Sequence, residues 1–277
     1  MDKLVEIPLD DLIALREKYR LRLADQGLGF FVLNNYIKWL QQDPNMGNFH
    51  TYSLNGDWSD GTFVTINHNQ IFGDTLNEDK SRLTKSLCLL DLDPKKHYRY
   101  NYKEPVRPAV WDFIKQRSLK TGLEWKFLWY YLTPECGAKV VVPELPKGFV
   151  AGLLTEKDIS AVNSSWPFHF DDSIKRLQCL HKYNIQMGIY TESGELAGFS
   201  LRYEFGALAV LHVNEPFRKR GLGTYLVKAM SKKIGECGEY TTSGIEEGNV
   251  ASIGLFESIG FKKNGFLYYL EILPSNE

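Results

Sequence analysis

The stretch Ala207-Leu-Ala-Val-Leu-His-Val-Asn-Glu-Pro-Phe-Arg-Lys-Arg-Gly-Leu-Gly-Thr224 decides how the second half of this chain folds. Residues 207–213 carry no acidic or basic charge at neutral pH and are mostly aliphatic, which is typical of a strand buried on both faces. The residues Asn214, Glu215 and Pro216 end that strand. From Gly221 onward the apolar residues follow helical spacing, namely Leu222, Leu226, Ala229, Met230 and Ile234. The stretch therefore predicts a strand, a tight turn and a helix.

The turn between strand and helix has the composition of an anion site. Residues 218–220 are Arg, Lys and Arg, and the glycines at 221 and 223 let backbone N–H groups approach a ligand closely. A diphosphate suits such a helix start. The loop lacks the Gly-Lys-Ser/Thr of a Walker A motif, and Leu226 stands where a dinucleotide fingerprint needs a small residue.

The next segment repeats the pattern of strand, turn and helix. Residues 240–245 predict a strand, and Glu246-Glu247-Gly248 predicts its turn. Asn249 can cap a helix whose apolar residues recur every fourth position, and Gly260 is placed to end it.

These two motifs together resemble the GNAT superfamily of N-acyltransferases. The Arg/Gln-x-x-Gly-x-Gly/Ala pattern at 218–223 is similar to its acyl-CoA diphosphate loop, and 249–261 is similar to the segment after its fifth strand. The resemblance implies acetyl-CoA or another acyl-CoA as co-substrate, with the strand before the loop pairing with the pantetheine arm. The implied cofactor-binding residues are Leu211, Val213, Arg218, Lys219, Arg220, Gly221, Leu222, Gly223, Thr224, Asn249 and Ser252.

A narrower resemblance is to the glycine N-acyltransferase family, which acylates the amino group of glycine or another small amino acid. It is carried by Val162-Asn163-x-x-Trp166, by Gly194-Glu-x-x-Gly198 and by the loop at 215–221. Mapped without gaps from Arg218, the family's general-base glutamate falls on Ala207, and the superfamily's general-acid tyrosine falls on Phe256. Both departures weaken the implication of ordinary glycine conjugation, but they leave acyl-CoA binding untouched.

Composition excludes several other classes of protein. The chain has 277 residues and a formal net charge of -1, so no overall basic field attracts nucleic acid. Its four cysteines and six histidines have no ligand spacing, which argues against a metal site and a disulfide framework. No apolar run reaches membrane-spanning length, and the N-terminus resembles neither a secretory signal nor a transit peptide. We expect an intracellular protein, cytoplasmic by default, while the family resemblance also allows a mitochondrial one.

The order of elements predicts two domains of α+β class. The segment 142–148, with two prolines and a glycine, is the best linker candidate, so we expect domains at 1–145 and 146–277. The second has the GNAT order of elements, a mixed central sheet flanked by helices. Because the hairpin at 49–67 and the run 87–94 faintly echo residues 184–213, we interpret the first domain as a degenerate GNAT-like copy without a phosphate loop. In this half we expect a helix over 9–23, glycine breakers at 27 and 29, a helix over 30–40 and a strand over 88–92.

Candidate catalytic residues are His212 and Glu204, the titratable groups nearest the strand. A packed residue at the strand edge is the competing interpretation for His212, and a solvated loop carboxylate is the competing interpretation for Glu204. Three functions stay open: an acyl-CoA-dependent N-acyltransferase acting on a small amine, a CoA-binding sensor or scaffold with little turnover, and a protein-directed acetyltransferase. The sequence fixes neither the acceptor nor the oligomeric state.

Overall fold

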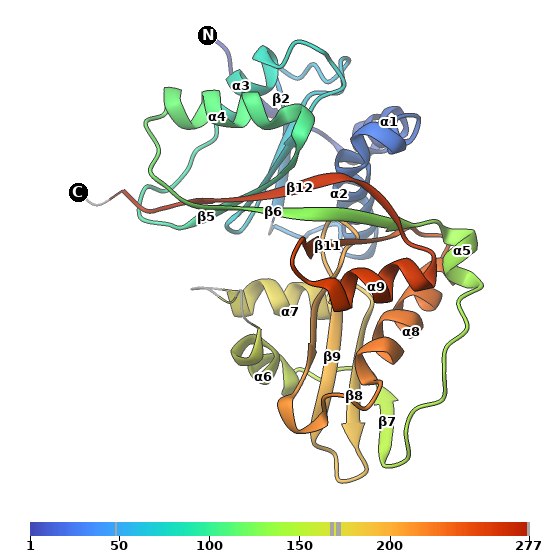
Figure 1. The fold of residues 1–277 in the computed structure, drawn as a ribbon. Coiled ribbons are helices and arrows are strands. Elements are labelled where there is room, and N and C mark those ends of the chain that lie inside the picture. The colour runs from blue at the N-terminus through green and yellow to red at the C-terminus, as the bar shows by residue number, and fades with distance from the viewer. Residues whose placement is uncertain (48, 167–168, 170–172, 276–277) are drawn as a thin grey trace. The chain divides into compact units, whose positions relative to one another are not determined.

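The structure is a computed structural model that describes residues 1–47, 49–166, 169 and 173–275, and it divides into two compact units (Figure 1). The first unit contains residues 1–128 and 264–277, and the second contains residues 129–263. The predicted boundary at 145/146 falls inside the second unit. The difference arises because the chain passes between units within two long strands, β6 (Thr121–Leu132) and β12 (Lys262–Ile272), rather than in the proline-rich segment.

The first unit is a mixed sheet with helices on both faces. Its strand order is β1-β2-β3-β4-β5-β12-β6, with β4 and β5 parallel and the other described pairs antiparallel. The strands are β1 (Leu4–Glu6), β2 (Phe49–Leu54), β3 (Phe63–Asn67), β4 (Gln70–Asp74) and β5 (Tyr98–Lys103). The helices are α1 (Leu9–Arg20), α2 (Leu23–Gln42), α3 (Ser81–Cys88) and α4 (Arg107–Gln116), with a 3-10 turn at Glu104–Val106.

Alternation along the strands of the first unit explains its two cores. Val64 and Ile71 pack with α3 and α4, whereas their neighbours Phe63 and Phe72 contact the aromatic rings of α1 and α2. Successive side chains of a strand point to opposite faces, so both faces of β3 and β4 are apolar. The dense aromatic residues of this half are therefore largely core.

The second unit contains a four-stranded antiparallel sheet in the order β10-β9-β8-β7. The strands of the second unit are β7 (Phe149–Gly152), β8 (Gln186–Thr191), β9 (Leu196–Arg202), β10 (Leu208–Val213) and β11 (Thr241–Glu246). Its helices are α5 (Pro134–Ala138), α6 (Asp158–Ser165), α7 (Ser173–Tyr183), α8 (Leu222–Glu236) and α9 (Val250–Ile259), with a 3-10 turn at Glu215–Phe217. The strand β11 is not part of this four-stranded sheet and is hydrogen-bonded to β6 instead. Leu222 and Leu226 of α8 pack with Ile189 and Ala197 of the sheet.

The same order of elements occurs twice along the chain. Leaving aside α5 and the 3-10 turns, both halves run strand, helix, helix, three strands, helix, strand, helix, strand. In each half the fourth strand lies parallel to the fifth, through Gln70↔Arg99 in the first half and Ala207↔Thr242 in the second. This repeat has the order of elements that the resemblance to the GNAT superfamily predicts, and α+β is the class expected from the sequence.

Two local expectations fail. Gly27 and Gly29 do not interrupt helical structure but lie within α2. A β-carbon on Gly29 would come within 2.4 Å of the Tyr19 ring. Glycine here allows α1 and α2 to pack closely. Residues 89–92 form no strand, because α3 continues to Cys88 and an irregular segment follows it.

Candidate functional site

Strand β10 is irregular where the site begins. Its pairing with β9 shifts register between Ala209 and His212, and Val210 has a φ of 50°. A β-branched residue in the left-handed region is an outlier that costs about 1–2 kcal/mol. Bulges of this kind redirect the strand and are common beside active sites.

β10 and β11 meet at one end and belong to different sheets beyond it. Among the described residues a parallel bridge joins Ala207 to Thr242, and it is the one backbone bridge described between the two segments. The Asn214 amide donates to the Ala197 carbonyl over 2.9 Å, so alternation turns the N–H groups of Leu211 and Val213 toward the β11 side. The half-buried edge at 211–213 can thus pair with an extended ligand.

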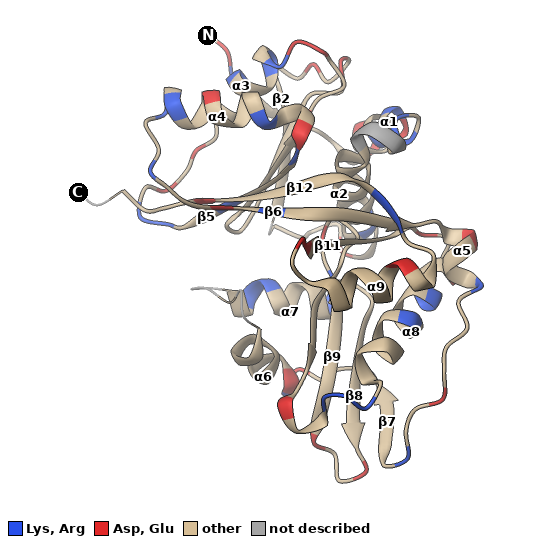
Figure 2. Cartoon of the chain, in the orientation of Figure 1, with Lys and Arg blue, Asp and Glu red and all other residues tan. Residues whose placement is uncertain are grey.

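The loop after β10 brings the predicted anion-binding residues together at the start of α8. Residues 218–221 are exposed, and Figure 2 shows this basic segment leading into the helix. Lys219 and Gly221 have φ values of 60° and 80°, a left-handed conformation that glycine adopts without strain. Arg218 Nε donates to the Val213 carbonyl over 3.0 Å, which fastens the loop to the end of β10.

The start of α8 has the features of an anion site. Gly221 is its N-cap, no side chain caps it in the described part of the chain, and its first turn carries no acidic residue. The first intrahelical bond runs from the Tyr225 amide to the Gly221 carbonyl, so the N–H groups of Leu222, Gly223 and Thr224 precede the helical ladder. Oriented amides, the helix dipole and three cations at 218–220 fit a diphosphate.

Asn249 and Ser252 lie at the start of α9. The Asn249 side-chain oxygen accepts from the Ser252 amide over 3.0 Å, and Gly260 ends the helix with a φ of 103°. The predicted cap and stop are confirmed. The side-chain oxygen of Asn249 thus caps the helix. A role of Asn249 and Ser252 in cofactor binding stays a prediction.

The two catalytic candidates differ in their surroundings. The half-buried His212 ring stacks on Phe199 with centroids 5.6 Å apart, and burial, with a smaller effect of Arg218, lowers its pKa from 6.5. Glu204 is not the solvated loop carboxylate expected as one interpretation, because it is fully buried between β9 and β10. Its Oε1 and Oε2 accept hydrogen bonds of 2.8 Å from Arg176 Nε and Nη2. Both oxygens of the Glu204 carboxylate are thus engaged by the guanidinium.

The two positions that depart from the glycine N-acyltransferase pattern are buried. Ala207 and Phe256 are each 2% exposed, and the Phe256 ring packs on Phe261 with centroids 4.8 Å apart. Neither side chain can transfer a proton.

The sequence analysis does not identify Arg176, although the pattern of its helix indicates that it is buried. In α7, Ser173, Arg176, Leu177 and Leu180 share one helical stripe, and all four are buried. An arginine on an otherwise apolar stripe needs a buried anionic partner. The position of Glu204 could not be inferred, because nothing in the sequence places the β9–β10 turn against α7.

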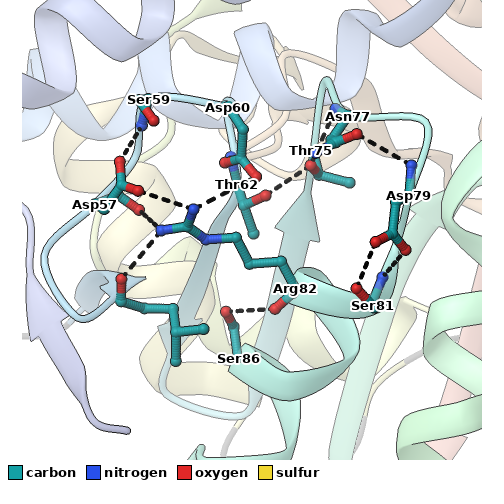
Figure 3. A network of polar contacts seen from close by, with 12 residues as sticks. Asp57, Ser59, Asp60, Thr62, Thr75, Asn77, Asp79, Ser81, Arg82 and Ser86 are labelled. Carbon is teal, nitrogen blue, oxygen red and sulfur yellow. Dashed lines mark hydrogen bonds and ion pairs between the residues drawn. The ribbon is translucent and has the colours of Figure 1, made fainter.

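The first unit has a different chemistry at the corresponding place, the start of α3 (Figure 3). Asp79 accepts from the Ser81 amide over 2.9 Å and from the Ser81 hydroxyl over 2.8 Å, and these bonds lower its pKa. Arg82, in the first turn, pairs with Asp57 over 2.9 Å. The chain's own carboxylates thus accept from the first residue of the helix and pair with its arginine.

Among the described residues, no group of three or more His, Cys, Asp or Glu side chains could hold a metal ion. In the same part of the chain, every helix is too short or too polar to cross a membrane.

Comparison with known proteins places the fold. The family model described as FR47-like protein matches residues 186–270, less than half of the chain. No curated protein matches the sequence. A Drosophila protein of solved structure is 23% identical over 100% of both chains, with a TM-score of 0.89.

The structural relatives include proteins that carry the GNAT name. A tandem GNAT protein from the clavulanic acid biosynthesis pathway is 12% identical over 100% of both chains, with a TM-score of 0.57. A putative GNAT acetyltransferase from Novosphingobium aromaticivorans is 18% identical, with a TM-score of 0.52, over 86% of this chain and 93% of that one. At such identities the likeness concerns fold, not activity. The fold is the GNAT fold, present in tandem; the narrower likeness to glycine N-acyltransferases has no support among these relatives.

Proposed function

We propose that the chain is an acyl-CoA-dependent N-acyltransferase that moves an acyl group from CoA to the amino group of a small acceptor such as glycine or another amino acid. The observation that carries the proposal is the start of α8, where exposed helix amides and the cations at 218–220 follow a bulged strand. Acetyl-CoA or another acyl-CoA would place its diphosphate there and its pantetheine arm along residues 211–213.

In the proposed reaction the acceptor amine forms a bond with the thioester carbonyl carbon, and the carbon–sulfur bond breaks to release CoA. The N–H groups of Leu211 and Val213 are suited to stabilise the charge that develops on the carbonyl oxygen. The proton of the amine leaves to water or to His212, whose lowered pKa keeps the imidazole neutral at pH 7. Positioning of the two reactants supplies the remaining acceleration.

A second candidate function is acyl-CoA binding without turnover, as in a sensor or scaffold. The side chains of Ala207 and Phe256 favour it, because both are buried and neither can act as base or acid. A screen of CoA release from acetyl, benzoyl and long-chain thioesters against a panel of amino acids separates the two functions. Release above background with one acceptor supports the enzyme, and binding without release supports the sensor.

Binding itself is tested by calorimetry on Gly221→Glu, which puts a carboxylate where the diphosphate would lie. Gly238→Glu is the matched control, since Gly238, just past the end of α8, is also exposed and left-handed with a φ of 72°. Each substitution strains the backbone by about 1–2 kcal/mol. We expect acetyl-CoA affinity to be lost only in Gly221→Glu; equal affinities in the two variants would overturn the proposed site.

The same titration gives the stoichiometry. Since Asp79 and Asp57 place two carboxylates at the start of α3, where they disfavour an anionic ligand, we propose one acyl-CoA per chain, bound by the second unit. Two bound molecules per native chain would contradict this.

A further inference from the structure

A buried ion pair lies between α7 and the turn that leads into β10. Arg176 and Glu204 form two parallel hydrogen bonds of 2.8 Å, and their side chains are 1% and 0% exposed. The Arg176 guanidinium also lies 4.3 Å from the centroid of the Tyr203 ring. Because burying both charges is costly, such a pair is weak evidence for stability, and an apolar pair of similar volume often replaces it without loss.

Glu204 lies in the turn of residues 203–207, and nearly every backbone carbonyl of this turn accepts a hydrogen bond. The Tyr203 amide donates to the Ala207 carbonyl over 2.8 Å, and the Gly206 amide donates to the Tyr203 carbonyl over 2.9 Å. On the other side, β11 donates from the Thr242 amide and hydroxyl and from the Ser243 hydroxyl. These three bonds, each of 3.2–3.4 Å, reach the carbonyls of Gly206, Phe205 and Leu208. The turn is therefore fixed to β11 by backbone and hydroxyl contacts, and to α7 by the ion pair.

This turn immediately precedes the point where β10 and β11 part. The bridge between Ala207 and Thr242 is the last described pair of the two strands, and the bulge at Val210 follows three residues later. A small rotation of the turn would change the direction of the strand edge at 211–213. That edge carries the amides that would pair with an extended ligand.

We propose that Arg176 and Glu204 are a positioning pair that sets the direction in which β10 leaves β11, and with it the placement of the Leu211 and Val213 amides against the thioester carbonyl. This inference rests on the proposed function. Neither residue acts on the acyl group directly. Binding of the CoA diphosphate depends on the loop at 218–223 and is independent of the pair.

The test uses the double variant Arg176→Met/Glu204→Leu, which removes both charges together so that neither is left buried alone. Acetyl-CoA labelled with carbon-13 at the carbonyl is added, and the carbonyl chemical shift of the bound form is measured by NMR beside the calorimetric Kd. We expect the Kd to stay within about threefold of native, while the bound carbonyl shift moves toward the value of free acetyl-CoA. In turnover, kcat should fall by about 10- to 100-fold at an unchanged KM for acetyl-CoA, as expected for misplacement at the reacting centre.

The matched control is a second buried pair in the same unit, Arg202 with Glu239 at 2.6 Å, whose side chains are 6% and 9% exposed. The variant Arg202→Met/Glu239→Leu should leave the carbonyl shift and kcat near native. Arg176→Lys, which keeps the charge without the planar fork, should give an intermediate shift.

Each outcome decides between the two proposals. Failure of the native protein to bind acetyl-CoA would overturn the proposed function and this inference with it. Native binding with an unchanged carbonyl shift in Arg176→Met/Glu204→Leu would overturn this inference alone, as would an equal change in the control. If the native protein binds acetyl-CoA but acylates no acceptor, the carbonyl shift still tests this inference, because it is measured without turnover.

Discussion

His212 is the titratable side chain of β10 and lies on its half-buried edge, stacked on Phe199. Burial disfavours its charged form, so its folded-state pKa lies below 6.5. Above that pKa the imidazole is neutral and can accept a proton, and below it this capacity is lost. Protonation of the acceptor amine lowers the rate as well, but over a higher pH range because amine pKa values are near 8 or above.

If His212 accepts the proton, the two titrations separate in a pH profile. We expect log kcat/KM for glycine to fall with a slope of 1 below the pKa of the amine and with a slope of 2 below that of His212. His212→Gln should show a slope of 1 throughout and a rate at pH 7 reduced by about 10²- to 10⁴-fold. His181→Gln, which removes a half-buried histidine of α7, is the control. A rate for His212→Gln at pH 7 equal to that of the native protein would assign His212 to packing alone.

The individual site residues could be predicted to different degrees. Gly221, Asn249 and Gly260 were predictable because turn and cap chemistry is local, and their backbone angles follow from a few neighbouring residues. The burial of Glu204 was not, since its partner Arg176 lies 28 residues away and only the tertiary fold brings them together. The bulge at Val210 was equally hidden, because valine is a strong strand former.

At the scale of elements, the helices and strands with strong periodicity were predictable, and those defined by packing were not. The helix α8 and the strand β10 each begin one residue later than expected, and β10 ends at the expected Val213. The expected break at residues 27–29 is wrong because tertiary packing overrides propensity there. A glycine inside a helix favours the unfolded chain, yet it also lets a neighbouring ring approach the backbone.

Because helix propensity and close packing act in opposite directions at a glycine, we expect opposite effects from two Gly→Ala substitutions in helices. A β-carbon at Gly29 would lie 2.4 Å from Tyr19 Cε1, and the Tyr19 hydroxyl holds the ring in place by donating to the Gly61 carbonyl over 2.7 Å. Gly29→Ala should therefore lower the free energy of unfolding by about 1–3 kcal/mol, the usual cost of overpacking. Gly254→Ala, in α9 with open space around the glycine, should raise it by about 0.5–1 kcal/mol through helix propensity. Urea denaturation measures both, and a stabilised Gly29→Ala would contradict the packing argument.

At the scale of the whole molecule, the sequence predicts two GNAT-like halves, but their division along the chain differs from the expected one. The final strand of the chain, β12, belongs from residue 264 onward to the first unit, where it lies between β5 and β6. Local signals such as the prolines and glycine of 142–148 mark an irregular segment, and the structure confirms that this segment has no helix or strand. Strand partners are not encoded locally, so no sequence pattern could assign β12 to the first unit.

The placement of β12 predicts that the first half cannot fold from its own residues. In β12, Leu267–Ile272 pair with residues 98–103 of β5, and Tyr268, Leu270 and Ile272 enter the core formed with α3 and α4. Burial of large apolar side chains contributes about 1.5–3 kcal/mol each, so the three together match much of the roughly 5–15 kcal/mol by which a domain is stable. The fragment 1–145 alone should lack the dispersed amide NMR spectrum of a folded protein, and a peptide of residues 262–277 added in trans should restore it. The same peptide carrying Leu270→Asp, a charge at a position with 0% exposure, should fail to do so. A folded spectrum from fragment 1–145 without peptide would contradict this prediction. It would mean that the first unit folds without the strand β12.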